Sequence, residues 1–68
     1  MIQRWDALHA CNEVKASLLR LSSALEALAV ADQVIAADAM AHAEEARNAA
    51  SAVDQWRTAI IGGMGLSR

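Results

Sequence analysis

The chain has 68 residues, of which 56% are hydrophobic, with a formal net charge of −2 and a single cysteine. A chain of this length forms one domain at most, and it buries only a small core by itself. One cysteine excludes an internal disulfide, and the negative net charge argues against nucleic acid as a partner. Without disulfides, so short a chain ordinarily gains stability by oligomerising.

The beginning of the chain lacks the features of a secretion signal. Arg4 and Asp6 interrupt the first ten residues, and no apolar segment follows them. The longest apolar runs, residues 27–31 and 59–61, are too short to cross a bilayer. A lone free thiol is typical of a reducing compartment. We therefore expect a soluble, cytoplasmic protein.

Residues 1–61 have the composition of helices. The chain contains 17 alanines and no proline, and its three glycines all follow Ile61. Alanine has the highest helix propensity, and the absence of Tyr and Phe disfavours strands. The closing segment GGMGLSR, residues 62–68, is predicted to end the last helix and form a flexible tail.

The apolar side chains repeat at heptad spacing. Intervals of four and three residues separate Val14, Leu18, Leu21, Leu25 and Leu28. The same count continues through Asp32, Ile35, Ala39, His42, Ala46, Ala49, Val53, Trp56 and Ile60. One uninterrupted helix of about 60 residues, ~90 Å long, is therefore a possible interpretation.

A turn near residues 29–33 is the favoured interpretation. Asp32 on a continuous seam would be costly, and the seam changes there from leucine to alanine. A turn instead makes Asp32 the N-cap of a second helix. We predict an all-α, antiparallel hairpin with helices at about residues 2–28 and 33–61. The capping-box spacing of Ser23 and Glu26 leaves a break near Ser23 as the alternative.

Folding back at this turn pairs leucine with alanine. If residue i faces about residue 62 − i, Leu25 faces Ala37 and Leu21 faces Ala41. Small residues opposite large ones let two helices approach closely. Trp5 is then expected to meet Trp56 at the open end. The predicted core or dimer anchors are Trp5, Leu18, Leu21, Leu25, Leu28, Val53, Trp56 and Ile60.

More apolar residues are present than one seam requires. The residues partly outside it are Trp5, Leu8, Leu19, Val30, Val34, Met40 and Ile61. A symmetric homodimer, in which two hairpins form an antiparallel four-helix bundle, would cover them. Alternatively, they widen a single apolar stripe, or they are reserved for a different protein.

No catalytic, cofactor or metal site is predicted. Asp38, His42 and Glu45 share one helix face, but their order is the reverse of the Glu-x-x-His pattern of di-iron bundles. A polar stripe with a helix-supporting ion pair is the preferred interpretation. His9 and Cys11 point to different sides of a helix, so a nucleophilic pair is not expected.

Acidic residues are concentrated in the middle of the chain. Residues 21–46 carry five acids and no Lys or Arg, whereas the remainder carries three acids and six bases. Such a band steers a protein toward basic surfaces. The predicted partner-binding residues are Glu26, Asp32, Asp38, Met40, Glu44 and Glu45. Alternatively, the acids only keep an alanine-rich helix soluble.

The short all-helical chain, the segment ALEALAVADQ and the lack of a catalytic motif resemble the phage-encoded quorum-sensing anti-activators that bind a host LuxR-type regulator. The chain resembles short antitoxins and secretion co-chaperones with helical hairpins to the same degree. The first resemblance implies a non-enzymatic inhibitor that occludes a larger host protein, such as a transcription factor. The alternative is a structural module, like a co-chaperone or antitoxin, that a partner helix completes.

Overall fold

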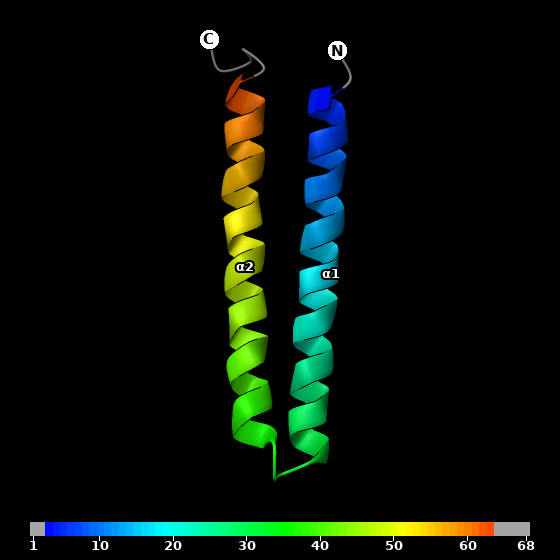
Figure 1. The fold of residues 1–68 in the computed structure, drawn as a ribbon, viewed down its shortest axis with the longest axis vertical. Helices are drawn as coiled ribbons and strands as arrows, with labels where there is room; N and C mark the ends of the chain where they lie inside the picture. The colour runs from blue at the N-terminus through cyan, green and yellow to red at the C-terminus, as the bar shows by residue number, and fades with distance from the viewer. Residues whose placement is uncertain (1–2, 64–68) are drawn as a thin grey trace.

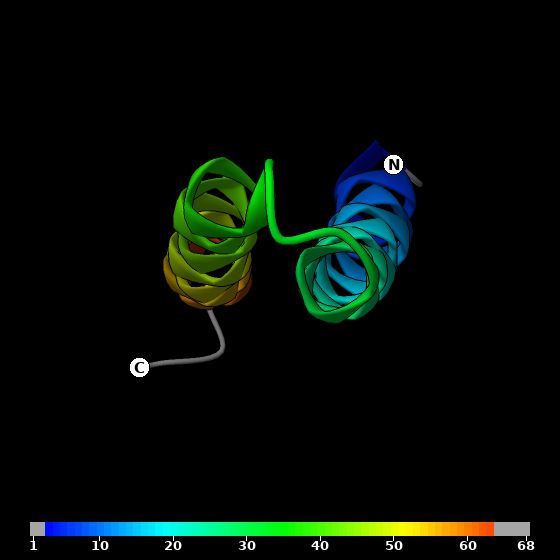
Figure 2. The same cartoon turned by 90° about the horizontal axis from the view of Figure 1, so that it is seen from below.

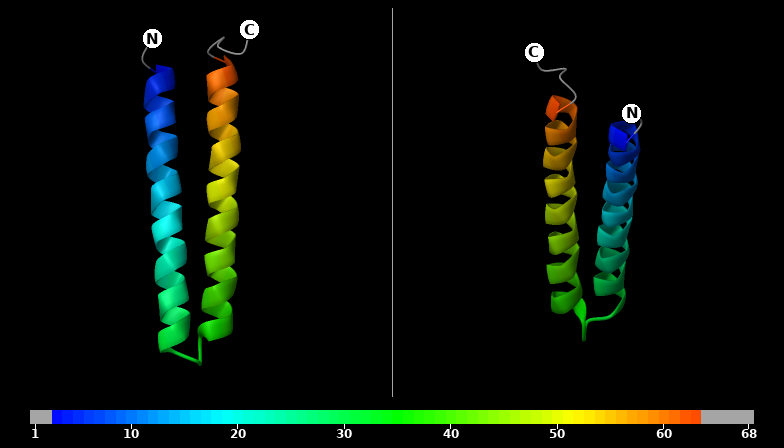
Figure 3. Two further views of the ribbon diagram at one scale, coloured as in Figure 1. Left: turned by 180° about the vertical axis from the view of Figure 1, so that it is seen from behind. Right: turned by 45° about the horizontal axis from the view of Figure 1, so that its top comes forward.

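The computed structural model describes residues 3–63, which form two antiparallel α-helices. Helix α1 spans Gln3–Ala31 and helix α2 spans Ala36–Gly63, with a short turn between them (Figure 1). Views from behind and from a tilted direction show the same two parallel axes (Figure 3). The structure confirms the predicted helical hairpin. A continuous helix and a break near Ser23 are both wrong, since α1 runs through Ser23 without interruption.

The hairpin is a single layer of structure. Its principal dimensions are 51 × 18 × 10 Å. Viewed along its length, the two helices lie beside each other, and within residues 3–63 no third element covers either broad face (Figure 2). Helix α2 includes Gly62 and Gly63, which were predicted to begin the tail. Residues 1–2 and 64–68 lie outside the described part of the chain, and most of the predicted tail falls there.

The turn lies about three residues later than predicted, and Asp32 stabilises it differently. The Asp32 amide donates to the Leu28 carbonyl at 3.0 Å and so extends the last turn of α1. The Asp32 carboxylate accepts from the amide of Val34 at 2.9 Å, which is an Asx-turn contact. Helix α2 begins only at Ala36. The prediction that Asp32 caps α2 is therefore wrong, because its carboxylate is already used within the turn.

The pairing of the helices differs from the prediction by five to seven residues, close to one heptad. Lys15 contacts Asp54 and Ser22 contacts Arg47, and α1 ends at Ala31 where α2 begins at Ala36, so residue i of α1 faces residue 67 − i to 69 − i of α2. The numbers of two paired residues add up to twice the number at the centre of the turn. Moving the turn by about three residues therefore changes this sum by about six. The predicted value of 62 − i is therefore wrong. A heptad repeat cannot distinguish the two registers, because a shift of seven residues brings equivalent faces together.

The new register separates the two tryptophans. In this register Trp5 lies six to eight residues, about 9–12 Å along the axis, beyond the level of Trp56. Both rings are more than half exposed, at 60% and 55%. The predicted contact between Trp5 and Trp56 is therefore wrong.

The interface between the helices is built from small side chains. Its buried residues are Ser22 and Ala29 of α1 and Ala39, Ala43, Ala46, Ala50 and Val53 of α2. Val53 is the largest side chain that is fully buried. Small residues allow the backbones to approach closely, as expected for alanine-rich pairing. An alanine methyl buries far less area than a leucine, whose full burial contributes about 1.5–3 kcal/mol, so this core is weak.

The residues near the helix interface form two parallel rows, one buried between the helices and one beside it. We call Ser22, Ala29, Ala43 and Ala50 the inner row; all four are buried between the helices. The outer row consists of Val14, Leu21 and Leu28 of α1 with Ile35, His42, Ala49 and Trp56 of α2. Each row repeats every seven residues on a helix. The members of the outer row were predicted to lie on the seam, but all of them except Ala49, which is half-buried, are exposed.

The predicted anchors consequently have different environments. Val53 lies in the core, and Leu18, Leu25 and Ile60 are half-buried. Leu21, Leu28 and the two tryptophans are exposed. Cys11 is half-buried with a free thiol.

Candidate protein-docking face

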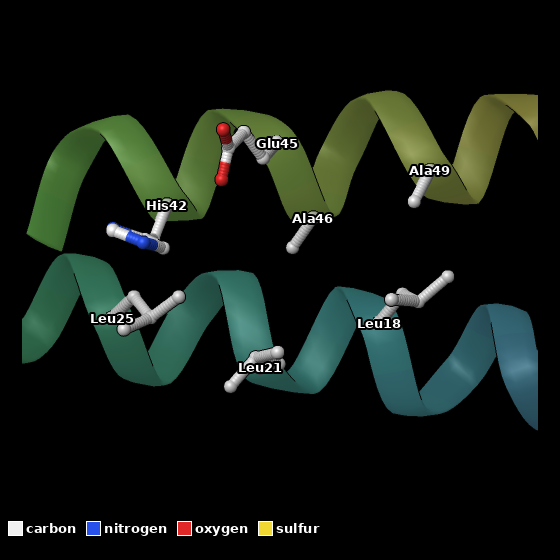
Figure 4. A pocket seen from close by; sticks show the side chains of 7 residues that line it. All are labelled: Leu18, Leu21, Leu25, His42, Glu45, Ala46 and Ala49. Carbon is white, nitrogen blue, oxygen red and sulfur yellow. The ribbon is translucent and has the colours of Figure 1, made fainter.

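An apolar groove runs between the two helices on one broad face of the hairpin. Its volume is about 420 Å³. The residues that line it are Leu18, Leu21 and Leu25 of α1 with His42, Glu45, Ala46 and Ala49 of α2 (Figure 4). The three leucines form one wall, and the side chains of α2 form the other. The groove therefore presents a leucine wall opposite a wall of two alanines with His42 and Glu45.

The outer row extends this groove toward both ends of the hairpin. Val14 and Leu28 lie seven residues on either side of Leu21, and Trp56 lies seven residues beyond Ala49. Val14, Leu21 and Leu28 are 44%, 49% and 45% exposed. We call the groove residues together with Val14, Leu28, Ile35 and Trp56 the apolar face. An apolar surface of this extent marks an interaction site more often than a region of bare surface.

His42 and Glu45 are the two ionisable residues that line the groove, and both are exposed. The Nδ1 of His42 lies 2.8 Å from the backbone oxygen of Asp38 and 3.7 Å from the Asp38 carboxylate. Donation to the Asp38 carbonyl, followed by the negative charges of Asp38 and Glu45, raises the pKa of His42 above its ordinary value of 6.5. The three residues thus form a local polar stripe, which includes the predicted ion pair.

The opposite broad face carries polar contacts between the helices. Lys15 Nζ donates to both carboxylate oxygens of Asp54, at 2.8 and 3.1 Å. Arg47 donates to the buried hydroxyl of Ser22 at 3.0 Å and also pairs with Glu26. These charged side chains are partly exposed, so each ion pair contributes at most about 1 kcal/mol. We call this the polar face, and its contacts favour one register of the hairpin.

The acidic residues predicted to bind a partner do not form one free surface. The carboxylate of Glu26 pairs with Arg47 on the polar face, and that of Asp32 is used in the turn. Asp38 lies beside His42, and Glu45 lines the groove. Met40 and Glu44 are exposed on α2, and Glu44 makes no ion pair with another residue of 3–63.

The described residues contain no cluster of three or more His, Cys, Asp or Glu side chains arranged to hold a metal. His9 lies 3.4 Å from Glu13, one turn along α1. Neither helix, over the part of the chain that the structure describes, combines the length and apolar character needed to cross a membrane.

No protein-family model, curated protein or solved structure matches this chain. The candidate site therefore has to be interpreted from its own residues. The strongest signal for it in the sequence was the run of leucines at heptad spacing, which was assigned to the inside of the hairpin.

Proposed function

We propose that this chain is a non-enzymatic, protein-binding regulator that docks on a larger protein and occludes part of its surface. The single observation that supports this function best is the uncovered apolar face. Leu21 and its heptad neighbours Val14 and Leu28 are almost half exposed in a hairpin with a weak core. Burying such side chains against another protein would release free energy that the isolated hairpin does not obtain.

Pairing of two hairpins into a four-helix bundle is part of this proposal. In the dimer the apolar faces cover each other and the polar faces stay outside, and the dimer is the form that docks, so losing the apolar face also abolishes docking. Exposed residues such as Met40 and Glu44 would remain available for a further protein. Negative charge on Glu44 and at the turn favours a target with a basic surface, such as the DNA-binding region of a transcription factor in the host.

A pair of matched leucines can test whether the apolar face is needed for binding. Leu21 lies in the groove, whereas Leu19 is similarly exposed, at 43%, but does not line it. We would capture proteins from a lysate of the native cell with tagged wild-type protein, with Leu21→Glu and with Leu19→Glu. The proposal expects one stoichiometric larger protein that is retained by Leu19→Glu and lost with Leu21→Glu. Equal retention by both variants would contradict a role for the apolar face in this function.

Charge reversal tests the electrostatic part separately. Glu44→Lys is expected to slow association with the captured protein and to reduce the dependence of the rate on salt, while helicity is unchanged. Association rates that match those of the wild type at every salt concentration would remove the steering role.

A second candidate function is a structural module that a helix of another protein completes. The observation that favours it is the alanine-rich core, which stabilises an isolated hairpin only weakly. This function predicts a poorly folded pure protein. A cooperative, concentration-dependent thermal transition of the pure chain, followed by circular dichroism, would argue against it.

A further inference from the structure

We infer that the apolar face binds a second copy of this chain, with both hairpin turns at the same end of the dimer and each α1 lying over α2 of the other copy. The inference rests on the proposed function, because it names the second copy that covers the apolar face in the dimer that this function requires.

The shape of the hairpin supports a second layer of the same kind. The molecule is 51 Å long but only 10 Å deep. Stable domains consist of at least two packed layers around a shared core, and here one layer exists with one apolar side. The groove runs parallel to both helices, so its natural complement is another antiparallel helix pair of equal length. A second copy has these dimensions and presents the same apolar face.

The surface area agrees with one subunit of a dimer. The chain exposes 4948 Å². A compact monomer of 7.2 kDa is expected to expose about 4100 Å². The excess of roughly 800 Å² matches the area that each partner contributes to a standard-sized protein interface.

The sizes of the side chains select the arrangement. In the groove, α1 carries Leu18, Leu21 and Leu25, whereas α2 carries Ala46 and Ala49 at the middle of its wall together with His42 and Glu45. A two-fold axis parallel to the helices puts each leucine wall over the alanine wall of the other copy. Large side chains then fill the space above small ones, which gives close helix packing.

The same symmetry also predicts which residues meet. Rotation about an axis parallel to the helices leaves the level of every residue along the bundle unchanged. In the close-up, Leu21 lies level with Ala46 and Leu18 lies level with Ala49, so these two leucines lie over the corresponding alanines of the second copy (Figure 4). If the turns lay at opposite ends, leucine would face leucine and alanine would face alanine. That arrangement would leave both crowding and unfilled space.

The decisive experiment measures the distance between the two turns in solution. Val34 lies in the turn and is 93% exposed, so a spin label there is remote from the apolar face. The label is attached to Val34→Cys in a Cys11→Ala background, since Cys11 is the chain's other possible attachment site. Light scattering is used on the same samples to establish their mass. A dimer of about 14 kDa, twice the chain mass of 7.2 kDa, with a label separation below about 30 Å supports the inference.

Two other outcomes overturn it in distinguishable ways. A dimer whose labels are separated by about the 51 Å length of the hairpin has its turns at opposite ends, which contradicts the arrangement. A protein that remains at 7.2 kDa at high concentration excludes a second copy as the occupant. If capture of a larger protein by that monomer still requires Leu21, docking survives without the dimer and the larger protein itself occupies the groove.

A pair of variants assigns the dimer to the apolar face. Leu21→Glu places a charge in the groove and is expected to raise the dimer dissociation constant at least 100-fold, while Leu19→Glu changes it less than about threefold. Circular dichroism at high concentration verifies that both variants are helical. If Leu21→Glu does not fold, the milder Leu21→Ala replaces it, with an expected increase of at least tenfold. Equal dissociation constants for the groove variant and its Leu19 control would overturn the inference.

Discussion

The inner and outer rows of this hairpin have the same spacing but opposite surroundings. Ser22, Ala29, Ala43 and Ala50 lie between the helices, while Leu21, Leu28 and other outer-row residues lie beside them in contact with solvent. The hairpin thus closes on its smallest side chains and leaves many of its largest ones outside. Hydrophobic burial within one chain does not explain this choice, because burying the leucines would remove more apolar area from water.

We infer that the inner row and the outer row serve different steps of assembly. Small inner-row residues let α1 and α2 approach closely, and the contacts of the polar face favour the correct register. Larger outer-row residues then supply the apolar surface for a second protein. Substitutions in the inner row should therefore affect folding of each hairpin, whereas substitutions in the outer row should affect association.

The largest expected effect comes from enlarging the inner row. Ala43 is completely buried, and Ala43→Leu would force the helices apart. We expect the free energy of unfolding to fall by about 2–3 kcal/mol in urea titrations at fixed protein concentration. Ala41→Leu, at an exposed position on the same helix, is the matched control and should change it by less than about 0.5 kcal/mol. Similar losses for both variants would mean that the inner row is not the tightly packed interface.

Shortening the outer row should produce a loss that depends on protein concentration. Leu21→Ala removes a side chain that is 49% exposed in the hairpin. At high concentration we expect about 1–2 kcal/mol of lost stability, because each copy loses a contact across the dimer. On dilution below the dissociation constant, the difference from the wild type should shrink to about 0.5 kcal/mol. Thermal unfolding at a series of concentrations checks this, and a loss that stays constant on dilution would place Leu21 inside the hairpin.

A smaller effect is expected on the polar face. Arg47→Met removes the donor to the buried Ser22 hydroxyl and the partner of Glu26. The expected loss is about 1 kcal/mol, with no change in oligomeric mass. Glu26→Gln is the control, since it leaves the contact between Arg47 and Ser22 available and should cost less than about 0.5 kcal/mol. A change of mass with Arg47→Met would show that the polar face takes part in association.

The smallest effect concerns pH. The pKa of His42 is raised in the folded chain above its ordinary value of 6.5, chiefly by donation to the Asp38 carbonyl. A raised pKa in the folded state means that protonation of His42 stabilises the hairpin. This contribution is complete below pH 6.5 and is lost as the pH rises through the raised pKa. His42→Gln should remove a shallow step from the pH profile of the thermal midpoint, and an identical profile for both proteins would exclude this contribution.

Several features of the fold could be predicted from the residues. The absence of proline, the glycines confined to the end and the cost of Asp32 on a seam led to the correct helical hairpin. The register could not be predicted in the same way, because two registers that differ by seven residues pair equivalent faces. Asp32 does belong to the turn, but its carboxylate accepts a hydrogen bond from the amide of Val34 rather than from the first turn of α2.

Residues of the groove could be identified from the sequence, but the groove itself was not predicted. Leu18, Leu21 and Leu25 were identified as anchors, and the structure brings them together as one wall. A spacing of three and four residues defines a stripe on each helix, but it does not specify which edge of that stripe faces the other helix. Side-chain size decides this here, because Ser22 permits a closer approach than Leu21 beside it.

The most direct test of the role of the apolar face uses the two leucines that the hairpin exposes almost equally. Leu19 is 43% exposed and Leu21 is 49% exposed. Their methyl groups can be resolved by NMR in the presence of a soluble paramagnetic agent, at a concentration at which the protein is associated. If the apolar face is a docking surface, the Leu21 methyls should be protected from the agent while the Leu19 methyls relax as freely exposed groups. Equal relaxation of the two at every concentration would contradict this account.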